Sequence, residues 1–155
     1  MKALRISILS LVLSIGSLLA SAVQAAECSG YDVLVNQVGE TLDLGQGHTM
    51  TVVRNHSMIV NNDPAAKDHL AIGECNGTFV NLPNGTTRGS GQCLRRDKDG
   101  DTYSLEWAIA AGADKGTFKT TGGTGKFAKI ANSGWWQNAA GFGKVFATKW
   151  GGTCN

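Results

Sequence analysis

The sequence predicts an all-β fold, in which eight short antiparallel strands form one domain, either a closed barrel or a two-sheet sandwich. The chain has 21 glycines and only 2 prolines. Asn-Gly and Asp-Gly steps recur between apolar stretches, as is typical of tight hairpin turns. No stretch repeats apolar residues with the period of an amphipathic helix. The expected strands cover residues 31–38, 48–60, 68–82, 86–97, 101–110, 115–121, 133–138 and 143–150.

Residues 1–25 have the three parts of a secretory signal peptide. Lys2 and Arg5 form a basic start, an apolar run follows, and small residues precede a cleavage point after Ala25. A membrane anchor is the alternative, but the apolar run is short for a span of ~20 residues and no charged stop follows it. We therefore expect residues 26–155 to be a mature domain that is exported to the periplasm or the cell exterior.

Removal of this leader changes the charge balance. The whole chain has 14 Lys and Arg against 12 Asp and Glu, and the leader holds two of the basic residues and none of the acidic ones. The mature domain therefore carries 12 residues of each sign. A neutral domain without a basic patch argues against nucleic acid as a partner, and against a membrane surface once the leader is gone.

All four cysteines, Cys28, Cys75, Cys93 and Cys154, lie in the exported part, where disulfides persist. Zinc is the alternative, but the chain has no C-x-x-C pair and the spacings are wide. We expect two disulfides, and neither a metal site nor a cofactor is indicated.

The segment Pro83–Gly85 predicts a three-residue hairpin loop, because its proline favours a type I turn and its glycine suits the left-handed position. This loop places Cys75 directly opposite Cys93, at a non-hydrogen-bonded site where side chains come closest. We therefore pair Cys75 with Cys93. Cys28 is then left with Cys154, and their bond would join the two ends of the domain.

A second hairpin is predicted at Asp99-Gly100, as a two-residue type I′ turn. The cross-strand pairs that follow are Leu94 with Leu105, Arg96 with Tyr103, and Gln92 with Trp107. Strand 101–110 alternates, and its aromatic side should face the core. Following that face through both hairpins predicts inward side chains at Gln92, Leu94, Glu74, Leu70, Ile72 and Val80. The Cys75–Cys93 bond would then lie on the outer face.

The most distinctive stretch consists of Gly122, Gly123, Thr124, Gly125, Lys126 and Phe127. It is not a phosphate-binding P-loop, because Thr120 stands where the first glycine is needed and a phenylalanine follows the lysine. Three of its positions fit a dinucleotide fingerprint, but no βαβ unit surrounds them. We expect a tight, glycine-enabled connection between strands.

Together with its neighbours, this stretch resembles the allene oxide cyclase and dirigent-like barrel group, above all its small exported bacterial members. The likeness covers about residues 95–136. It rests on Lys115–Phe118, Gly122–Phe127, Ile130, Ser133–Trp135, Asp99–Asp101, Tyr103, Glu106 and Trp107. The resemblance implies an eight-stranded antiparallel barrel with an apolar interior. Some members steer or cyclise reactive small molecules without metal or cofactor, and some relatives form trimers. We match none of the plant enzymes' functional residues to positions in this chain, and no site residue is carried over.

Asp97, Asp99 and Asp101 alternate like the start of an EF-hand loop. That loop requires glycine at its sixth position and glutamate at its twelfth, and this chain has neither. A solvated hairpin turn is the better interpretation.

A candidate pocket depends on which face of strand 48–60 is buried. If His48, Arg54 and His56 point inward, they meet other polar groups on apolar walls, which is typical of a small-molecule pocket. The candidate ligand-binding residues are then Arg54, His56, Glu74, Gln92, Tyr103 and Trp107. The acid–base candidates are Glu74, Tyr103 and His56. The alternative, which we favour, buries the opposite face, with Thr51, Val53 and Ile59, or lets the polar groups satisfy one another in a filled barrel.

Three functions follow from these alternatives. The first is an exported barrel that binds a small apolar or aromatic ligand in its lumen. The second is a surface or interaction protein with a filled barrel, in which one of the adjacent Trp135 and Trp136 is exposed for a partner. The third is a cofactor-free isomerase or cyclase.

Overall fold

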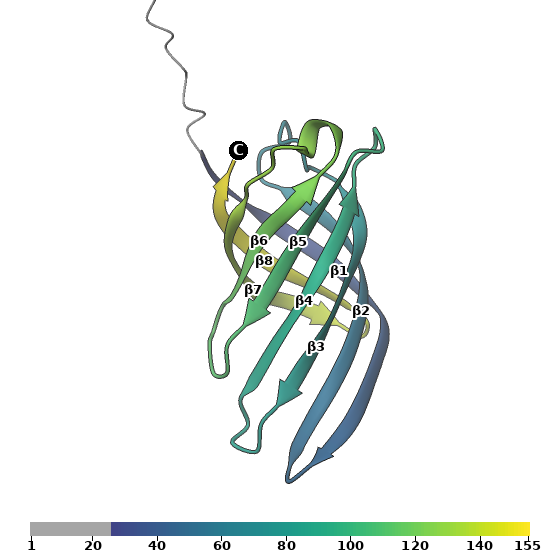
Figure 1. Cartoon of the computed structure of the whole chain (residues 1–155), viewed down its shortest axis with the longest axis vertical. Coiled ribbons are helices and arrows are strands. Elements are labelled where there is room, and N and C mark those ends of the chain that lie inside the picture. The colour runs from purple at the N-terminus through teal and green to yellow at the C-terminus, as the bar shows by residue number, and fades with distance from the viewer. Residues whose placement is uncertain (1–25) are drawn as a thin grey trace, which may run out of the picture.

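Eight antiparallel strands follow one another around a closed barrel, and the last strand returns to pair with the first (Figure 1). The structure is a computed structural model that describes residues 26–155, so the predicted leader lies outside the described residues. The elements are β1 (Ala26–Gly45), β2 (His48–Asn61), β3 (Ile72–Asn81), β4 (Thr87–Arg96), β5 (Thr102–Ile109), β6 (Gly116–Gly123), the 3₁₀ helix η1 (Gly125–Phe127), β7 (Ser133–Phe142) and β8 (Val145–Cys154). The predicted barrel is confirmed, and closure of the sheet rules out the sandwich. Within residues 26–155, no helix is long and apolar enough to cross a membrane.

The first strand is longer than the sequence predicted. β1 starts at Ala26 and continues to Gly45, and a bulge between Asn36 and Val38 shifts its register against β2. Its end was missed because the turn to β2 is unusual. Gly45, Gln46 and Gly47 all have positive φ, and a Gly-Gln-Gly step is not one of the strong hairpin signals.

Both predicted disulfides are confirmed. Leu82 N donates to Thr86 O at 2.8 Å across the predicted three-residue loop, which places Cys75 opposite Cys93. The second bond, Cys28–Cys154, joins β1 to β8 at the seam that closes the barrel. Two disulfides are typical of a chain that folds in an oxidising, exported compartment.

The predicted register of the second hairpin was wrong by one residue. Asp97 N donates to Asp101 O at 3.0 Å, so three residues form the loop instead of two. The Asp97 Oδ1 atom causes this, because it accepts from the backbone N of both Asp99 and Asp101 at 2.9 Å. The observed pairs are therefore Gly91 with Trp107, Cys93 with Leu105, and Arg95 with Tyr103.

A shift of one residue moves every side chain of a strand to the opposite face. The inward placement predicted for Gln92, Leu94, Glu74, Leu70, Ile72 and Val80 was therefore wrong. Leu94 is 57% exposed and Ile72 is 60% exposed. The Cys75–Cys93 bond lies inside the barrel, where each cysteine is only 4% exposed. The expectation that the aromatic side of β5 faces the core is confirmed, since Tyr103 and Leu105 are buried.

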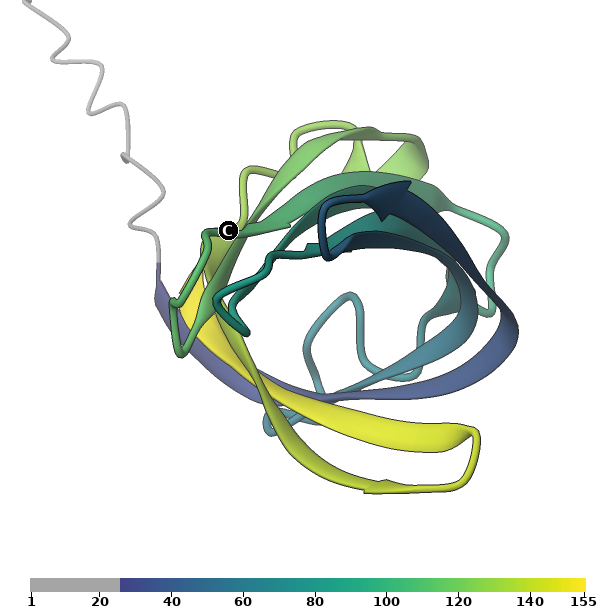
Figure 2. The ribbon, with the colours of Figure 1, turned by 90° about the horizontal axis from the view of Figure 1, so that it is seen from below.

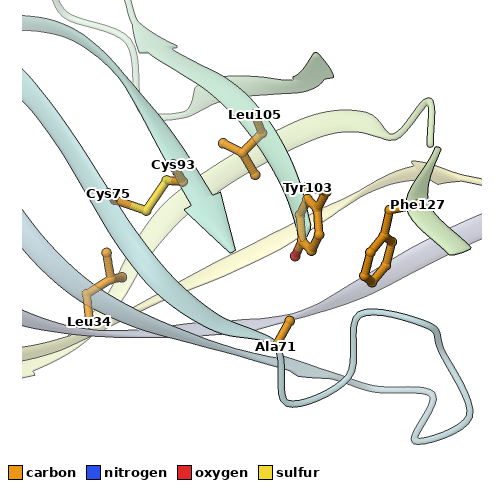
Figure 3. Close-up of a cluster of buried hydrophobic side chains, with 7 residues drawn as sticks. All are labelled: Leu34, Ala71, Cys75, Cys93, Tyr103, Leu105 and Phe127. Atoms are coloured by element: carbon orange, nitrogen blue, oxygen red, sulfur yellow. A yellow bond between two sulfur atoms is a disulfide. The ribbon is translucent and has the colours of Figure 1, made fainter. Parts of the chain in front are cut away.

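A hydrophobic cluster closes one end of the barrel (Figure 3). Phe127 of η1 and Ala71 of the segment between β2 and β3 meet Tyr103 of β5 in this cluster. Figure 2 looks into the barrel from the other end and shows the β2–β3 segment crossing the far end. The other members are Leu34, Cys75, Cys93 and Leu105. The barrel is thus closed at the end that carries η1.

Candidate functional site

A cavity of about 750 Å³ occupies the interior of the barrel. This volume is in the range of ordinary small-molecule sites, which cover ~300–1,000 Å³. Aromatic and aliphatic side chains form most of its wall. They include Leu34, Val53, Ile59, Phe79, Leu105, Trp107, Ile109, Phe118, Trp136, Phe146 and Trp150. Its polar lining includes Asp32, Asn36, Asn55, Asp68, Arg95 and Tyr103.

Glycines in the wall keep this cavity open. Trp107 lies against Gly91, its partner on β4, and against Gly77, the partner of Gly91 on β3. A Cβ at either glycine would collide with the indole ring. Trp136 covers Gly116 on β6 in the same way. Since each indole lies over bare backbone, the wall is apolar while the centre of the lumen stays free.

The aromatic rings form a connected wall. Phe79 stacks on Trp107 with ring centroids 5.2 Å apart, and Trp136 meets Trp107 edge to face at 6.0 Å. Phe118 and Trp150 make a second edge-to-face pair at 6.2 Å. Offset and edge-to-face contacts of this kind stabilise pairs of aromatic side chains.

A buried ion pair crosses the lumen between β4 and β1. Arg95, which is 4% exposed, contacts the Asp32 carboxylate through Nη2 and donates from Nε to the Ser57 Oγ at 3.1 Å. Its Nη2 also lies 3.6 Å from the Cys75 Sγ. A buried charge is tolerated where it has a close counter-charge and further hydrogen bonds, as Arg95 has.

Burial and neighbouring charges shift the pKa values of Asp32, Arg95 and Tyr103. Desolvation raises the pKa of the Asp32 carboxyl, and Arg95 and Ser57 act in the opposite direction. Desolvation works against the charge of Arg95, but Asp32 and Tyr103 outweigh it and raise the guanidinium pKa. Burial also raises the pKa of Tyr103 to about 12, so its side chain is a neutral phenol at physiological pH.

Several polar atoms of the lumen have no partner within the protein. They are Asp32 Oδ1, Asn36 Oδ1, Asn55 Oδ1 and Trp150 Nε1, and all four residues line the cavity. Buried polar atoms in proteins are nearly always hydrogen-bonded, because leaving one unpaired costs about 1–3 kcal/mol. The four residues that carry these unpaired atoms lie around one cavity.

Most of the predicted pocket residues lie outside the barrel. Arg54 and Glu74 form an ion pair at 2.7 Å on the outer face, and His56 Nε2 lies 3.5 Å from Glu74. Hydrogen bonding from Arg54 is the main reason why the pKa of Glu74 is lowered. Gln92 is exposed as well. The inward placement predicted for Glu74 and Gln92 was therefore wrong, and Arg54 and His56 lie on the outer face, as in the alternative that we favour.

Tyr103 and Trp107 do line the lumen, as predicted. The buried face of β2 is the one that carries Val53 and Ile59, which is the alternative that we favoured. Sequence reasoning missed Asp32, Asn55 and Arg95. Strand alternation could have found Asn55, which lies two residues from Val53 on the buried face of β2.

The Gly122–Phe127 stretch makes a tight connection, as predicted, and it locks the closed end of the barrel. Gly125 has a φ of +48°, and a Cβ there would collide with the Asp101 carboxylate. That carboxylate accepts from the Lys126 backbone N at 3.1 Å. Lys126 Nζ pairs with Asp97 and with Asp99, the latter at 3.1 Å. Phe127 packs on Tyr103 with ring centroids 4.8 Å apart.

This arrangement gives the three alternating aspartates hydrogen-bond partners within the protein. Hydrogen bonding from Lys126 is the main reason why the pKa of Asp97 is lowered, and Lys98 and then Lys126 lower that of Asp99. Across the part of the chain that the structure describes, no group of three or more His, Cys, Asp or Glu side chains is placed to hold a metal ion.

Comparison with known proteins gives a match in fold only. No known family profile matches the chain, and no curated protein matches its sequence. A β-barrel-like protein from Acinetobacter baumannii AYE has a TM-score of 0.57 and 11% identity, over 85% of this chain and 96% of the other. The pterocarpan synthase dirigent protein GePTS1 has a TM-score of 0.51 and 11% identity, over 84% and 87%. A second pterocarpan synthase dirigent protein, PsPTS1, has a TM-score of 0.50 and 10% identity, over 84% and 94%. The chain thus shares the barrel fold of the dirigent-like group, as its sequence resemblance predicted.

Proposed function

We propose that this protein is an exported barrel that binds a small, mainly aromatic molecule in its lumen. The observation that carries the proposal is the cavity of about 750 Å³, with stacked aromatic side chains on its wall and unpaired buried polar atoms at its inner surface. A concave, mostly apolar site with a few polar groups is the usual form of a small-molecule site. The interaction protein with a filled barrel receives no support from a hollow lumen.

An enzyme remains the second candidate. Acid–base chemistry in the lumen would need titratable groups that face it, and His56 and Glu74 do not. Asp32 and Tyr103 line the cavity, and burial raises the pKa of both. Buried titratable groups with shifted pKa values are candidates for acid–base roles. A cofactor-free isomerase would therefore act through Asp32 and Tyr103. Conversion of a bound ligand into an isomer by the wild-type protein, absent in the Tyr103→Phe variant, would support this candidate.

The first test is native mass spectrometry of the protein purified from its own exported fraction without reducing agent. An added mass of a few hundred daltons that disappears on denaturation would support the proposal and give the size of the ligand. The same spectrum gives the oligomeric state, and the mass of the chain shows whether the leader has been removed after Ala25.

Two adjacent valines provide a matched pair of variants. Val53 faces the lumen, and Val52 lies on the outer face with 36% exposure. Val53→Phe should fill part of the cavity and weaken binding of the ligand at least tenfold, whereas Val52→Phe should leave binding unchanged. Equal binding by the two variants, measured by calorimetry with the released ligand, would place the site elsewhere and refute lumen binding.

A further inference from the structure

Most of the unpaired buried polar atoms around the lumen are hydrogen-bond acceptors. Its unpaired buried atoms are three side-chain oxygens, of Asp32, Asn36 and Asn55, and one donor, Trp150 Nε1. Asp32 is 7% exposed and Asn55 is 6% exposed, so neither group has bulk water as an alternative partner. An ionised carboxylate can only accept. A molecule that donates hydrogen bonds would therefore satisfy more of these atoms than one that accepts them.

The charges of the cavity lining also favour a ligand that donates hydrogen bonds. The ionisable side chains that line the cavity are Arg95, Asp32, Asp68 and Tyr103. With the phenol neutral, the lining carries one positive and two negative charges. Asp68 has a neutral hydrogen-bond partner, since its Oδ1 accepts from Asn61 Nδ2 at 3.0 Å. Poorly solvated charges act strongly on one another, so a lining with a negative balance favours a cation and disfavours an anion.

The positions of these groups define an orientation for the guest. Asn36 and Asn55 are directly opposite each other on β1 and β2, and Asp32 follows on the same inner face towards the closed end. The wall formed by Phe79 and Trp107 lies further from that end, because these residues are near the C-terminal ends of β3 and β5, whereas Ala71 and Tyr103 of the closed end are near their starts. Arg95 already occupies Asp32 Oδ2, which leaves Oδ1 free on the same carboxylate.

We infer that the lumen takes an aromatic amine, with its protonated nitrogen at the Asp32 carboxylate and the asparagine oxygens and its ring against the Trp107 wall. This inference rests on the proposed lumen binding and adds the chemical class of the ligand. An aromatic carboxylate fits poorly, because Arg95 is engaged by Asp32 and Ser57, and only one of the four unpaired buried atoms of the lumen, Trp150 Nε1, is a donor.

Three probes with the same ring test this on the unaltered protein, namely 2-naphthylethylamine, 2-naphthylethanol and 2-naphthylacetate. Their affinities are measured by isothermal titration calorimetry at pH 7. We expect the amine to bind at least tenfold more tightly than the carboxylate, with the alcohol between them. A carboxylate or alcohol that binds as tightly as the amine overturns the inference but leaves lumen binding intact. If no probe binds and the native mass is that of the empty chain, both proposals fail.

Two variants then locate the effect. Asp32→Asn would leave Arg95 buried without its counter-ion, which endangers folding. Asp68→Asn instead removes one negative charge from the lining and leaves the Arg95–Asp32 pair in place. It should reduce the amine-over-carboxylate ratio at least threefold. Glu74→Gln removes the same charge from the outer face and should leave the ratio unchanged. If the ratio of amine affinity to carboxylate affinity is the same in wild type and Asp68→Asn, the negative charge of the lining is not the source of the selectivity.

Discussion

Trp107 on β5 lies flat against the backbone of Gly91, its cross-strand partner on β4. The indole occupies the space that a side chain at position 91 would fill. This pairing gives the barrel an aromatic wall without filling its centre. Glycine normally weakens a strand, and a large ring packed over it shields the exposed backbone.

The Gly91→Ala variant tests this relationship. The added Cβ would collide with the indole of Trp107 and with the backbone oxygen of Asn76, so both the strand and the ring must move. We expect a loss of about 1–3 kcal/mol in the free energy of unfolding, as for other overpacked cores. We also expect weaker ligand binding, because the ring is displaced towards the lumen. Thermal denaturation and calorimetry measure the two effects.

Gly141→Ala is the matched control. Gly141 has no positive φ, and the nearest atom to an added Cβ would be Phe146 Cβ at 3.4 Å. Its melting temperature should stay close to that of wild type. If Gly91→Ala behaves like this control, the close approach between Trp107 and Gly91 is not a constraint on the fold.

The Arg95–Asp32 pair predicts a dependence of stability on pH. In the Arg95→Met variant the Asp32 carboxylate stays buried without its counter-charge, which should cost about 3–5 kcal/mol at neutral pH. Burial already raises the pKa of Asp32 above 3.8 in the folded chain, and loss of Arg95 raises it further. The folded state therefore binds the proton more tightly than the unfolded chain. This contribution is complete below the unfolded-state pKa and is lost as the pH rises through the folded-state value.

The deficit of Arg95→Met should therefore shrink as the pH is lowered from about 7 to about 4. Urea denaturation at a series of pH values, with wild type measured alongside, provides the comparison. The double variant Asp32→Leu with Arg95→Met removes both charges and should recover most of the lost stability at pH 7. A deficit that is constant across pH would show that Asp32 is not the group responsible.

The fold could be predicted from local signals, but apart from Tyr103 and Trp107 the site could not. The Pro83–Gly85 turn fixes the register of β3 against β4, and this alone identified both disulfides. The next turn depends on a side chain, since Asp97 captures two backbone N–H groups and lengthens the loop by one residue. The added loop residue shifts the register by one and so determines which face of β4 points inward.

The ion pair of the lumen was also beyond the reach of sequence patterns. Arg95 and Arg96 are adjacent, so one must point inward, but a charged residue is normally assigned to the surface. Its partner Asp32 lies 63 residues away in the chain. Only the closure of the barrel, which brings β1 opposite β4 across the lumen, makes the pair.

The two disulfides should differ in stability and in access. Cys28 and Cys154 are separated by 126 residues and are partly exposed, whereas Cys75 and Cys93 are separated by 18 and are buried. Loop-closure entropy predicts that removing the first bond costs about 4–5 kcal/mol and removing the second about 3 kcal/mol. Mild reductant should open Cys28–Cys154 first, as detected by thiol alkylation and mass spectrometry. Earlier alkylation of Cys75 and Cys93 would contradict their placement inside the barrel.

Phe127 provides the sharpest test of the closed end of the barrel. Its side chain is 1% exposed and packs on Tyr103, so Phe127→Ala should leave a cavity and cost about 3–5 kcal/mol. Phe142 at the β7–β8 turn is 91% exposed, and Phe142→Ala should change stability by about 0.5 kcal/mol or less. Urea denaturation measures both variants under the same conditions. A small loss in Phe127→Ala, comparable with that of Phe142→Ala, would mean that the Gly122–Phe127 stretch does not hold the end of the barrel shut. A large loss would show that the Gly122–Phe127 stretch has a structural role. Although it fits a dinucleotide fingerprint in part, its function in this fold would be to hold the Phe127 ring in the core.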